Sequence, residues 1–191
     1  MRLHAPLIML AALAFVPAAQ ADFTGVSLDA AYYFPDTSTV YPNGSFTPST
    51  FVVGAGVETT GNIEDVTFLP VDFSANTLTI DFNTSLPDPT LQNRPFNGII
   101  FNLLSAGTLG ITGVTVDGST TLPGFSAGQV SFTDTQLLIN FSGQSYNDGD
   151  RLALNFTFAP VPEPAAMVSM GTGLVGLAGF TIRRRRKVAA R

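Results

Sequence analysis

The sequence predicts an all-β protein: a single antiparallel β-sandwich of about nine strands, flanked by an N-terminal signal peptide and a C-terminal transmembrane helix. Three observations support this prediction. Between residues 22 and 160, apolar and polar residues alternate in short runs, and no run has a convincing helical period. Gly, Pro, Asn, Asp and Ser separate these runs. The chain has no cysteine, so about 140 residues rich in Phe, Leu, Val and Ile must form one core without disulfides.

The expected strands follow from this alternation, which is clearest at 151–158, where every second residue is apolar. Pro70 interrupts the apolar residues of 66–73, which indicates an edge strand or a bulge, because proline cannot donate a ladder hydrogen bond. Short polar turns at 74–76 and 134–135 would close two hairpins. Strands are expected at 26–34, 50–57, 66–68, 71–73, 77–82, 98–104, 111–116, 129–133, 136–141 and 151–158, with proline-rich loops at 41–48 and 85–95.

Residues 1–21 have the pattern of a secretory signal peptide. Arg2 supplies a positive charge, an apolar stretch covers 7–16, and small residues precede the expected cleavage site. The apolar stretch is short for an ordinary membrane anchor, although a retained N-terminal anchor is the alternative. We therefore expect export through the Sec translocon and cleavage by signal peptidase at the site formed by Ala19, Ala21 and Asp22.

The C-terminus has three features in a fixed order. Residues 161–164 read Val-Pro-Glu-Pro, which is rigid and extended because each proline fixes φ and disfavours helix before it. Residues 165–182 contain no ionisable side chain, and as a helix they would span about 27 Å, close to the thickness of a bilayer core. The cations of 183–187 would stay in the cytoplasm. This order predicts an anchor with the body outside. A proline-rich linker before a simple anchor is the alternative.

Together these features resemble the PEP-CTERM protein-sorting signal over residues 161–187. The resemblance implies recognition by an exosortase, a multi-spanning membrane cysteine transpeptidase, with cleavage near the motif and removal of the helix. It also implies a bacterial protein held in the inner membrane with a cytoplasmic C-terminus before processing, and delivered afterwards to the cell surface or an exopolysaccharide matrix. The sorting motif is assigned to Val161, Pro162, Glu163 and Pro164, and the basic stop to Arg183, Arg184, Arg185, Arg186 and Lys187.

The expected mature body is acidic and lacks several reactive residue types. The single histidine, His4, lies in the signal peptide, and residues 22–160 contain no lysine or cysteine. This composition excludes a serine–histidine triad, a cysteine nucleophile, a His/Cys zinc site and a lysine Schiff base. Of the 14 acids only Glu163 lies outside these residues, and of the nine bases only Arg94 and Arg151 lie inside, so the body's net charge is −11. Such a charge excludes nucleic acid as a partner.

Two groups of residues offer oxygen ligands to a metal. Asn147, Asp148 and Asp150, around a glycine, form a weak Ca²⁺ candidate. The preferred alternative is an ordinary Asn/Asp/Gly turn. A second weak group contains Glu58 and the pair Glu64-Asp65, and a solvated loop explains it better. Apart from Ca²⁺, no cofactor is expected.

Tyrosines and paired acids give two further candidate sites. Tyr32, Tyr33 and Tyr41 could stack on sugar rings, but adjacent strand residues point to opposite faces, so at most one of the first two could take part. The preferred alternative is a core or cross-strand role. Asp72 and Asp81 could face each other as the carboxylate pair of a glycosidase. Both occupy polar positions of their strands, which favours outward solubilising charge instead.

These observations lead to one main functional hypothesis, a non-enzymatic exported protein of the cell surface or extracellular matrix that an exosortase-like enzyme processes. The alternative is an adhesion module that binds Ca²⁺ or a glycan, such as an exopolysaccharide, and follows the same route. A glycosidase that works with carboxylates alone is a third, weaker hypothesis.

Overall fold

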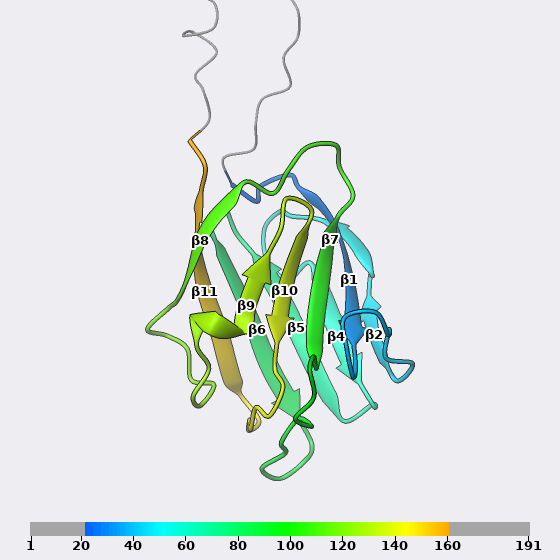
Figure 1. The fold of residues 1–191 in the computed structure, drawn as a ribbon. Helices are drawn as coiled ribbons and strands as arrows, with labels where there is room; N and C mark the ends of the chain where they lie inside the picture. The colour runs from blue at the N-terminus through cyan, green and yellow to red at the C-terminus, as the bar shows by residue number, and fades with distance from the viewer. Residues whose placement is uncertain (1–21, 161–191) are drawn as a thin grey trace, which may run out of the picture. The chain divides into compact units, whose positions relative to one another are not determined.

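The computed structural model describes residues 22–160, and within them the chain forms a β-sandwich of two antiparallel sheets (Figure 1). The first sheet has the strand order β3-β1-β7-β10-β9 and the second has the order β2-β4-β5-β6-β11-β8. The first sheet consists of β1 (Ser27–Tyr33), β3 (Thr50–Val52), β7 (Gly98–Leu103), β9 (Val130–Phe132) and β10 (Gln136–Asn140). The second consists of β2 (Gly44–Thr47), β4 (Thr59–Ile63), β5 (Thr67–Phe73), β6 (Thr77–Thr84), β8 (Ile111–Val116) and β11 (Asp150–Phe158).

Helical structure in the described part of the chain is limited to one 3₁₀ turn, η1 (Ala127–Gln129). No helix within residues 22–160 is long and apolar enough to cross a membrane. The predicted signal peptide at 1–21 and the predicted transmembrane helix at 165–182 both lie outside the described residues.

The core forms between the two sheets from the apolar residues that alternate along each strand. On β6, for example, Leu78, Ile80 and Phe82 are fully buried, and the residues between them are only partly buried. Phe73 of the second sheet contacts Phe101 of the first, edge to face, with ring centroids 5.1 Å apart. Because burying each such side chain contributes about 1.5–3 kcal/mol, this core can stabilise a domain that has no disulfide. The fully buried side chains come from both sheets and include Leu28, Tyr32, Leu69, Val71, Phe73, Leu78, Ile80, Phe82, Ile99, Phe101, Leu137, Ile139, Leu152 and Leu154.

The all-β sandwich is confirmed, but it has eleven strands rather than about nine. The additional strands are β2, within the predicted loop 41–48, and β4, within the group that was expected to be a solvated loop. The sequence Thr-Thr-Gly-Asn-Ile of β4 shows no apolar alternation, yet Thr59, Gly61 and Ile63 face the core. Gly61 is required there, because a Cβ at this position would lie 2.9 Å from Cε1 of Phe46. The strand expected at 50–57 ends early, at Val52.

The prediction for Pro70 was wrong. Pro70 lies in β5, an interior strand between β4 and β6, and not on an edge. There is no bulge either, because the pairs Phe68–Asn83 and Val71–Ile80 belong to one continuous register. Pro70 lies opposite Thr60 of β4, but it has no paired residue on β6. The sheet therefore accommodates the missing N–H of proline by a short interruption of the pairing between β5 and β6. Both predicted hairpin turns, 74–76 and 134–135, are confirmed.

The described chain begins and ends at the same end of the sandwich, which we call the tail end (Figure 1). Phe23, only 1% exposed, fills this end and contacts the rings of Phe73, Phe156 and Phe158 at centroid distances of 5.0, 5.1 and 5.0 Å. The tail end also carries the connections at 53–58, 74–76, 104–110 and 133–135. The opposite end, here the far end, carries the connections at 34–43, 64–66, 85–97, 117–129 and 141–149.

Candidate functional site

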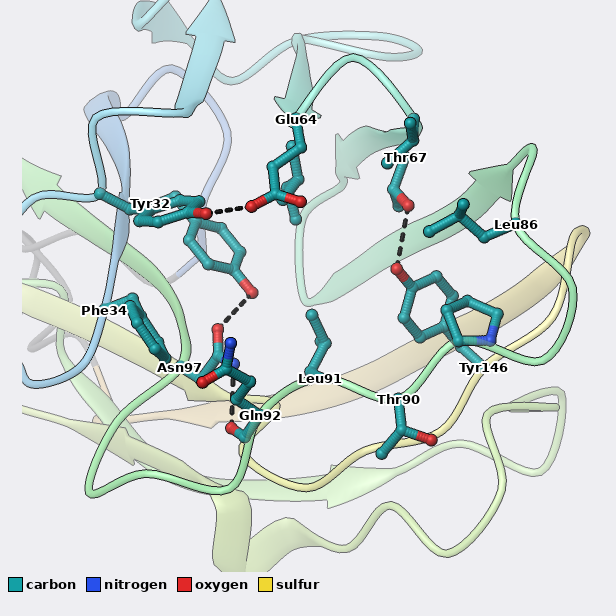
Figure 2. A pocket seen from close by; sticks show the side chains of 14 residues that line it. Tyr32, Phe34, Glu64, Thr67, Leu86, Thr90, Leu91, Gln92, Asn97 and Tyr146 are labelled. Carbon is teal, nitrogen blue, oxygen red and sulfur yellow. Dashed lines mark hydrogen bonds between the residues drawn. The ribbon is translucent and has the colours of Figure 1, made fainter.

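A pocket of about 160 Å³ lies at the far end, where loops from both sheets meet (Figure 2). Tyr32 comes from β1, Thr67 from β5 and Tyr146 from the connection between β10 and β11. Glu64 follows β4, and Asn97 directly precedes β7. Five separate segments therefore build one site, which we call the far-end pocket.

Tyr32 forms the inner wall of this pocket. It faces inward because it occupies a buried position in the alternating pattern of β1, and it is 1% exposed. Its hydroxyl donates a hydrogen bond to Oδ1 of Asn97 at 2.8 Å, and Nδ2 of Asn97 donates to the carbonyl of Gln92 at 3.0 Å. Burial raises the pKa of Tyr32, so the phenol stays neutral at any physiological pH.

Tyr41 and Glu64 form the rim. The Tyr41 hydroxyl donates a hydrogen bond to Oε1 of Glu64, and this bond, together with partial burial, raises the pKa of Tyr41. Glu64 is held by its backbone, with a φ of 56° and its N–H bonded to the carbonyl of Asn43 at 2.9 Å. The Tyr41 ring lies 6.2 Å from that of Tyr32 and 5.6 Å from that of Phe34. The rim thus combines an aromatic ring with an exposed carboxylate.

Tyr146 lines the other side of the pocket. Its hydroxyl is 2.9 Å from Oγ1 of Thr67, which is in turn 3.0 Å from Oγ1 of Thr84. Thr67 and Tyr146 are 1% and 4% exposed, so this hydroxyl chain is buried. It joins a loop to β5 and β6 and fixes the orientation of the Tyr146 ring, whose centroid lies 5.0 Å from that of the Phe82 ring at an interplanar angle of 50°.

The loop that covers the pocket is tied to the neighbouring connection between β10 and β11. The N–H of Leu91 bonds to the carbonyl of Gln144 at 2.9 Å, and the N–H of Tyr146 bonds to the carbonyl of Pro89 at 3.1 Å. Thr90 and Ser145 also pair through their hydroxyls at 2.8 Å. These bonds form the pocket wall without any ligand.

Among the described residues that line the pocket, Glu64 is the one ionisable acid and there is no Lys, Arg or His. The lining therefore offers aromatic and aliphatic surface, hydroxyls, amides and one negative charge. A second hollow beside Gly124 and residues 142–145 is larger, about 540 Å³, but it is open to solvent and has no aromatic lining residue. We regard the far-end pocket as the better-formed site.

Part of the tyrosine prediction is supported. The structure brings Tyr32 and Tyr41 together in one pocket, whereas Tyr33 points to the opposite face of β1, as the alternation requires. The core reading is also correct for Tyr32, since its side chain is buried. Sequence reasoning missed Tyr146 and Asn97. Both lie in irregular segments, and only the pairing of distant strands brings them next to Tyr32.

The weak Ca²⁺ candidate forms a compact turn. Oδ2 of Asp150 accepts the N–H of Asn147 at 2.7 Å, Oδ1 of Asp148 accepts the N–H of Thr84 at 3.0 Å, and Gly149 has a φ of 84°. Both carboxylates therefore accept hydrogen bonds from backbone N–H groups, which agrees with the interpretation as an ordinary turn. Within residues 22–160, no group of three or more His, Cys, Asp or Glu side chains is arranged to hold a metal ion.

The remaining acidic residues, predicted as a second metal group and as a carboxylate pair, lie far apart or bond to other groups of the protein. Glu58 accepts the N–H groups of Gly54 and Phe73 at 3.0 and 2.8 Å at the tail end, whereas Glu64 and Asp65 lie beyond the other end of β4. Asp81 forms an ion pair with Arg151 at 2.5 Å, and Asp72 is opposite Thr79. Neither Asp72 nor Asp81 lines the far-end pocket.

The predicted sorting residues 161–164 and 183–187, and Ala19 and Ala21 of the cleavage site, lie outside the described residues. Asp22 is the first described residue, and its Oδ1 accepts the N–H of Thr24 at 2.8 Å. The final strand, β11, ends at Phe158, and the N–H of Ala159 bonds to the carbonyl of Gly110 at 2.8 Å. Two residues, Ala159 and Pro160, therefore separate an interior strand of the sheet from the predicted motif.

Comparison with known families finds one match, the PEP-CTERM protein-sorting motif, over residues 160–186. No curated protein and no solved structure matches the chain. The family match includes the whole Val-Pro-Glu-Pro stretch and all but the last of the five consecutive cations. The chain therefore carries a PEP-CTERM sorting motif at its C-terminus, which supports exosortase-dependent sorting of an exported protein.

Proposed function

We propose that this chain is a non-enzymatic protein of the cell surface or extracellular matrix. It enters the Sec translocon by its signal peptide and is held in the inner membrane by residues 165–182, with the cations of 183–187 in the cytoplasm. An exosortase-like transpeptidase then binds the motif around Glu163 and removes the helix. The family match at residues 160–186 is the observation that carries this proposal.

The fold supports the proposal through the position of the motif. β11 is paired along its whole length, first with β6 over residues 150–155 and then with β8 over residues 154–158, so its pairing reaches the residues that precede the motif. The folded body is therefore rigid almost to Pro160, and the extended motif is the first stretch after it that a protease groove could accept. Cleavage there would release or transfer the sandwich without removing any of its strands.

The position of residue 160 in the fold supports an expectation about which end of the body faces outward. β11 has nine residues, so it spans about 30 Å between the two ends of the sandwich. A body held by residue 160 keeps its tail end next to the membrane or attachment point. The far-end pocket then faces away from it, toward the medium or matrix.

The test is to replace Glu163 by Ala in the full chain, in a bacterium that has the exosortase. We expect the variant to be exported but to retain its C-terminal helix, because the enzyme has lost the only charged group of its recognition motif. Mass spectrometry of the C-terminal peptide measures this. Glu64→Ala is the matched control, since it removes an exposed glutamate from the body, and it should mature normally. A normally shortened Glu163→Ala protein would show that Glu163 is not recognised.

The adhesion hypothesis remains a second candidate, and the far-end pocket favours its glycan form. The Ca²⁺ form has weaker support, because Asp148 and Asp150 already bind backbone N–H groups of their own turn and its neighbour. A thermal shift on addition of Ca²⁺ to the purified chain would revive the Ca²⁺ form.

A further inference from the structure

We infer that the far-end pocket binds a single neutral sugar ring. The inference deepens the proposed function and rests on it in one respect, that export places the far end of the sandwich in contact with carbohydrate outside the cell. The binding chemistry itself depends only on the residues of the pocket.

The size of the pocket limits the ligand to one ring. An engineered protein cavity of about 150 Å³ accommodates benzene, and the far-end pocket has a similar volume of about 160 Å³. It is partly open, and Glu64, Leu86 and Thr90 of its lining are exposed, so substituents of a ring, or the next residue of a polymer, can extend into solvent. A sugar unit at the end or on a branch of a polysaccharide fits this shape, whereas a unit in the middle of a polysaccharide chain does not.

The charges around the pocket disfavour an anionic ligand. Glu64 contributes a negative charge, and no cationic side chain lines the pocket to offset it. The body as a whole is also strongly acidic, with 13 acids and only two bases in residues 22–160. Phosphates, sulfates and uronic acids would therefore be repelled on approach and unpaired when bound.

The polar groups of the lining match the hydroxyls of a sugar. Glu64 and Asn97 present oxygen acceptors, and the hydroxyls of Thr67 and Tyr146, whose protons serve the Thr67–Thr84 and Tyr146–Thr67 bonds, can each accept a further hydrogen bond. The lining also includes the ring of Tyr41 and the aliphatic side chain of Leu91. A pyranose has this same combination of hydroxylated edges and an apolar C–H face. Pockets that bind such ligands combine apolar walls with a few placed polar groups.

A quaternary ammonium ion is the main competitor, because aromatic rings and a carboxylate can also bind cations. The ring arrangement argues against it. The Tyr41 and Phe34 rings are nearly perpendicular, at 72°, and in contact with each other at 5.6 Å. Tyr32 is buried at the back and hydrogen-bonded through its hydroxyl. The rings therefore pack together instead of surrounding an open space with their faces.

The pocket is also preorganised. The bonds of Leu91 and Tyr146 to neighbouring backbone carbonyls hold the covering loop, and the Tyr41–Glu64 bond holds the rim. A ligand therefore does not have to order the site, which lowers the entropic cost of binding. For a ligand of one ring, we expect a dissociation constant of about 1 mM.

The experiment is a calorimetric titration of the full-length chain in a polyoxyethylene detergent, which contains neither sugar nor ammonium groups. The probes are glucose, galactose, mannose and N-acetylglucosamine, with glucuronate and choline as charged counterparts. We expect saturable binding of at least one neutral sugar, and binding of glucuronate and choline that is at least about tenfold weaker.

Two variants place the binding in the pocket. Tyr41→Ala and Glu64→Ala should each weaken the sugar's affinity about tenfold, because they remove the ring and the acceptor at the rim. Tyr33→Ala is the matched control for the first, since Tyr33 lies on the opposite face of β1, and it should bind normally. A melting curve for each variant shows that it is folded, and the exposed Glu64 provides the safer substitution.

The inference is overturned if no neutral sugar binds, if choline binds more tightly than any sugar, or if Tyr41→Ala and Glu64→Ala bind as the unaltered chain does. These outcomes are separate from failure of the sorting proposal. Glu163→Ala should bind sugar normally even though it is not processed, and Glu64→Ala should be processed normally even though it binds poorly.

Discussion

The two ends of the sandwich differ in how they are closed. At the tail end, Phe23 inserts into the core and contacts three phenylalanine rings, two of them on β11. At the far end, three tyrosines line an open pocket, and each bonds to a different polar partner, Tyr32 to Asn97, Tyr41 to Glu64 and Tyr146 to the buried Thr67. One end is closed by apolar packing, and the other retains a cavity with polar walls.

This difference separates stability from binding. Apolar packing at the tail end fixes the last strand, so the body stays folded when the residues that follow it are pulled or cut. The hydrogen bonds among polar side chains at the far end stabilise the fold less per residue, but these side chains can also form hydrogen bonds to a ligand. The first two predictions compare the two ends directly.

The largest expected effect is at the tail end. Replacing Phe23 by Ala should lower the free energy of unfolding by about 3–5 kcal/mol, because it leaves a cavity among three aromatic rings. Denaturant unfolding followed by circular dichroism measures this. Thr24→Ala is a suitable neighbour control, since it removes little apolar volume. A loss below about 1 kcal/mol would mean that Phe23 does not close the core.

A smaller effect is expected at the far end. Tyr146→Phe removes the hydroxyl bonded to Thr67 but keeps the ring that packs on Phe82, so the free energy of unfolding should fall by about 0.5–1.5 kcal/mol. Thr67 keeps Thr84 as a partner, which limits the loss. The same denaturant titration applies. A loss as large as that of Phe23→Ala would contradict the distinction between the two ends.

The sequence predicted the strands well where the alternation is regular, as in β1, β6 and β11. It failed at β4, because Thr59 and Gly61 are buried although neither is a large apolar residue. The packing of Phe46 over Gly61 decides this strand, and no local pattern reveals such a long-range contact. The prediction of an edge strand or a bulge at Pro70 failed for a similar reason, since pairing with the neighbouring strands holds β5 in register on both sides of this residue.

The two functional regions differ in the same way. The sorting motif is read as a linear peptide, so its order of proline, glutamate, apolar run and cations is visible without a fold, and the family comparison matches it. The far-end pocket depends on which loops meet. Tyr32 and Tyr41 were noticed as residue types, but their proximity to Tyr146 and Asn97 follows from sheet order, which the sequence pattern does not determine.

The smallest effect expected concerns pH. Asp117, which directly follows β8 beside the middle of β11, accepts hydrogen bonds from the N–H and hydroxyl of Ser119 at 2.9 and 2.7 Å and from Nδ2 of Asn155 at 2.7 Å. These bonds, those from Ser119 first, lower the pKa of Asp117 to about 2. A carboxyl with a lowered pKa in the folded state contributes stability that is complete above its unfolded pKa of about 3.9 and is lost as pH falls toward the folded value.

Acid should therefore destabilise the unaltered chain between about pH 4 and pH 2, and Asp117→Asn should reduce that pH dependence. Melting temperatures measured across this range test it. Asp134→Asn gives the same change in net charge in a tail-end turn, and it should leave the slope closer to that of the unaltered chain. If both variants flatten the curve equally, the acid sensitivity reflects net charge. If Asp117→Asn acts alone, the hydrogen bonds from Ser119 and Asn155 are responsible.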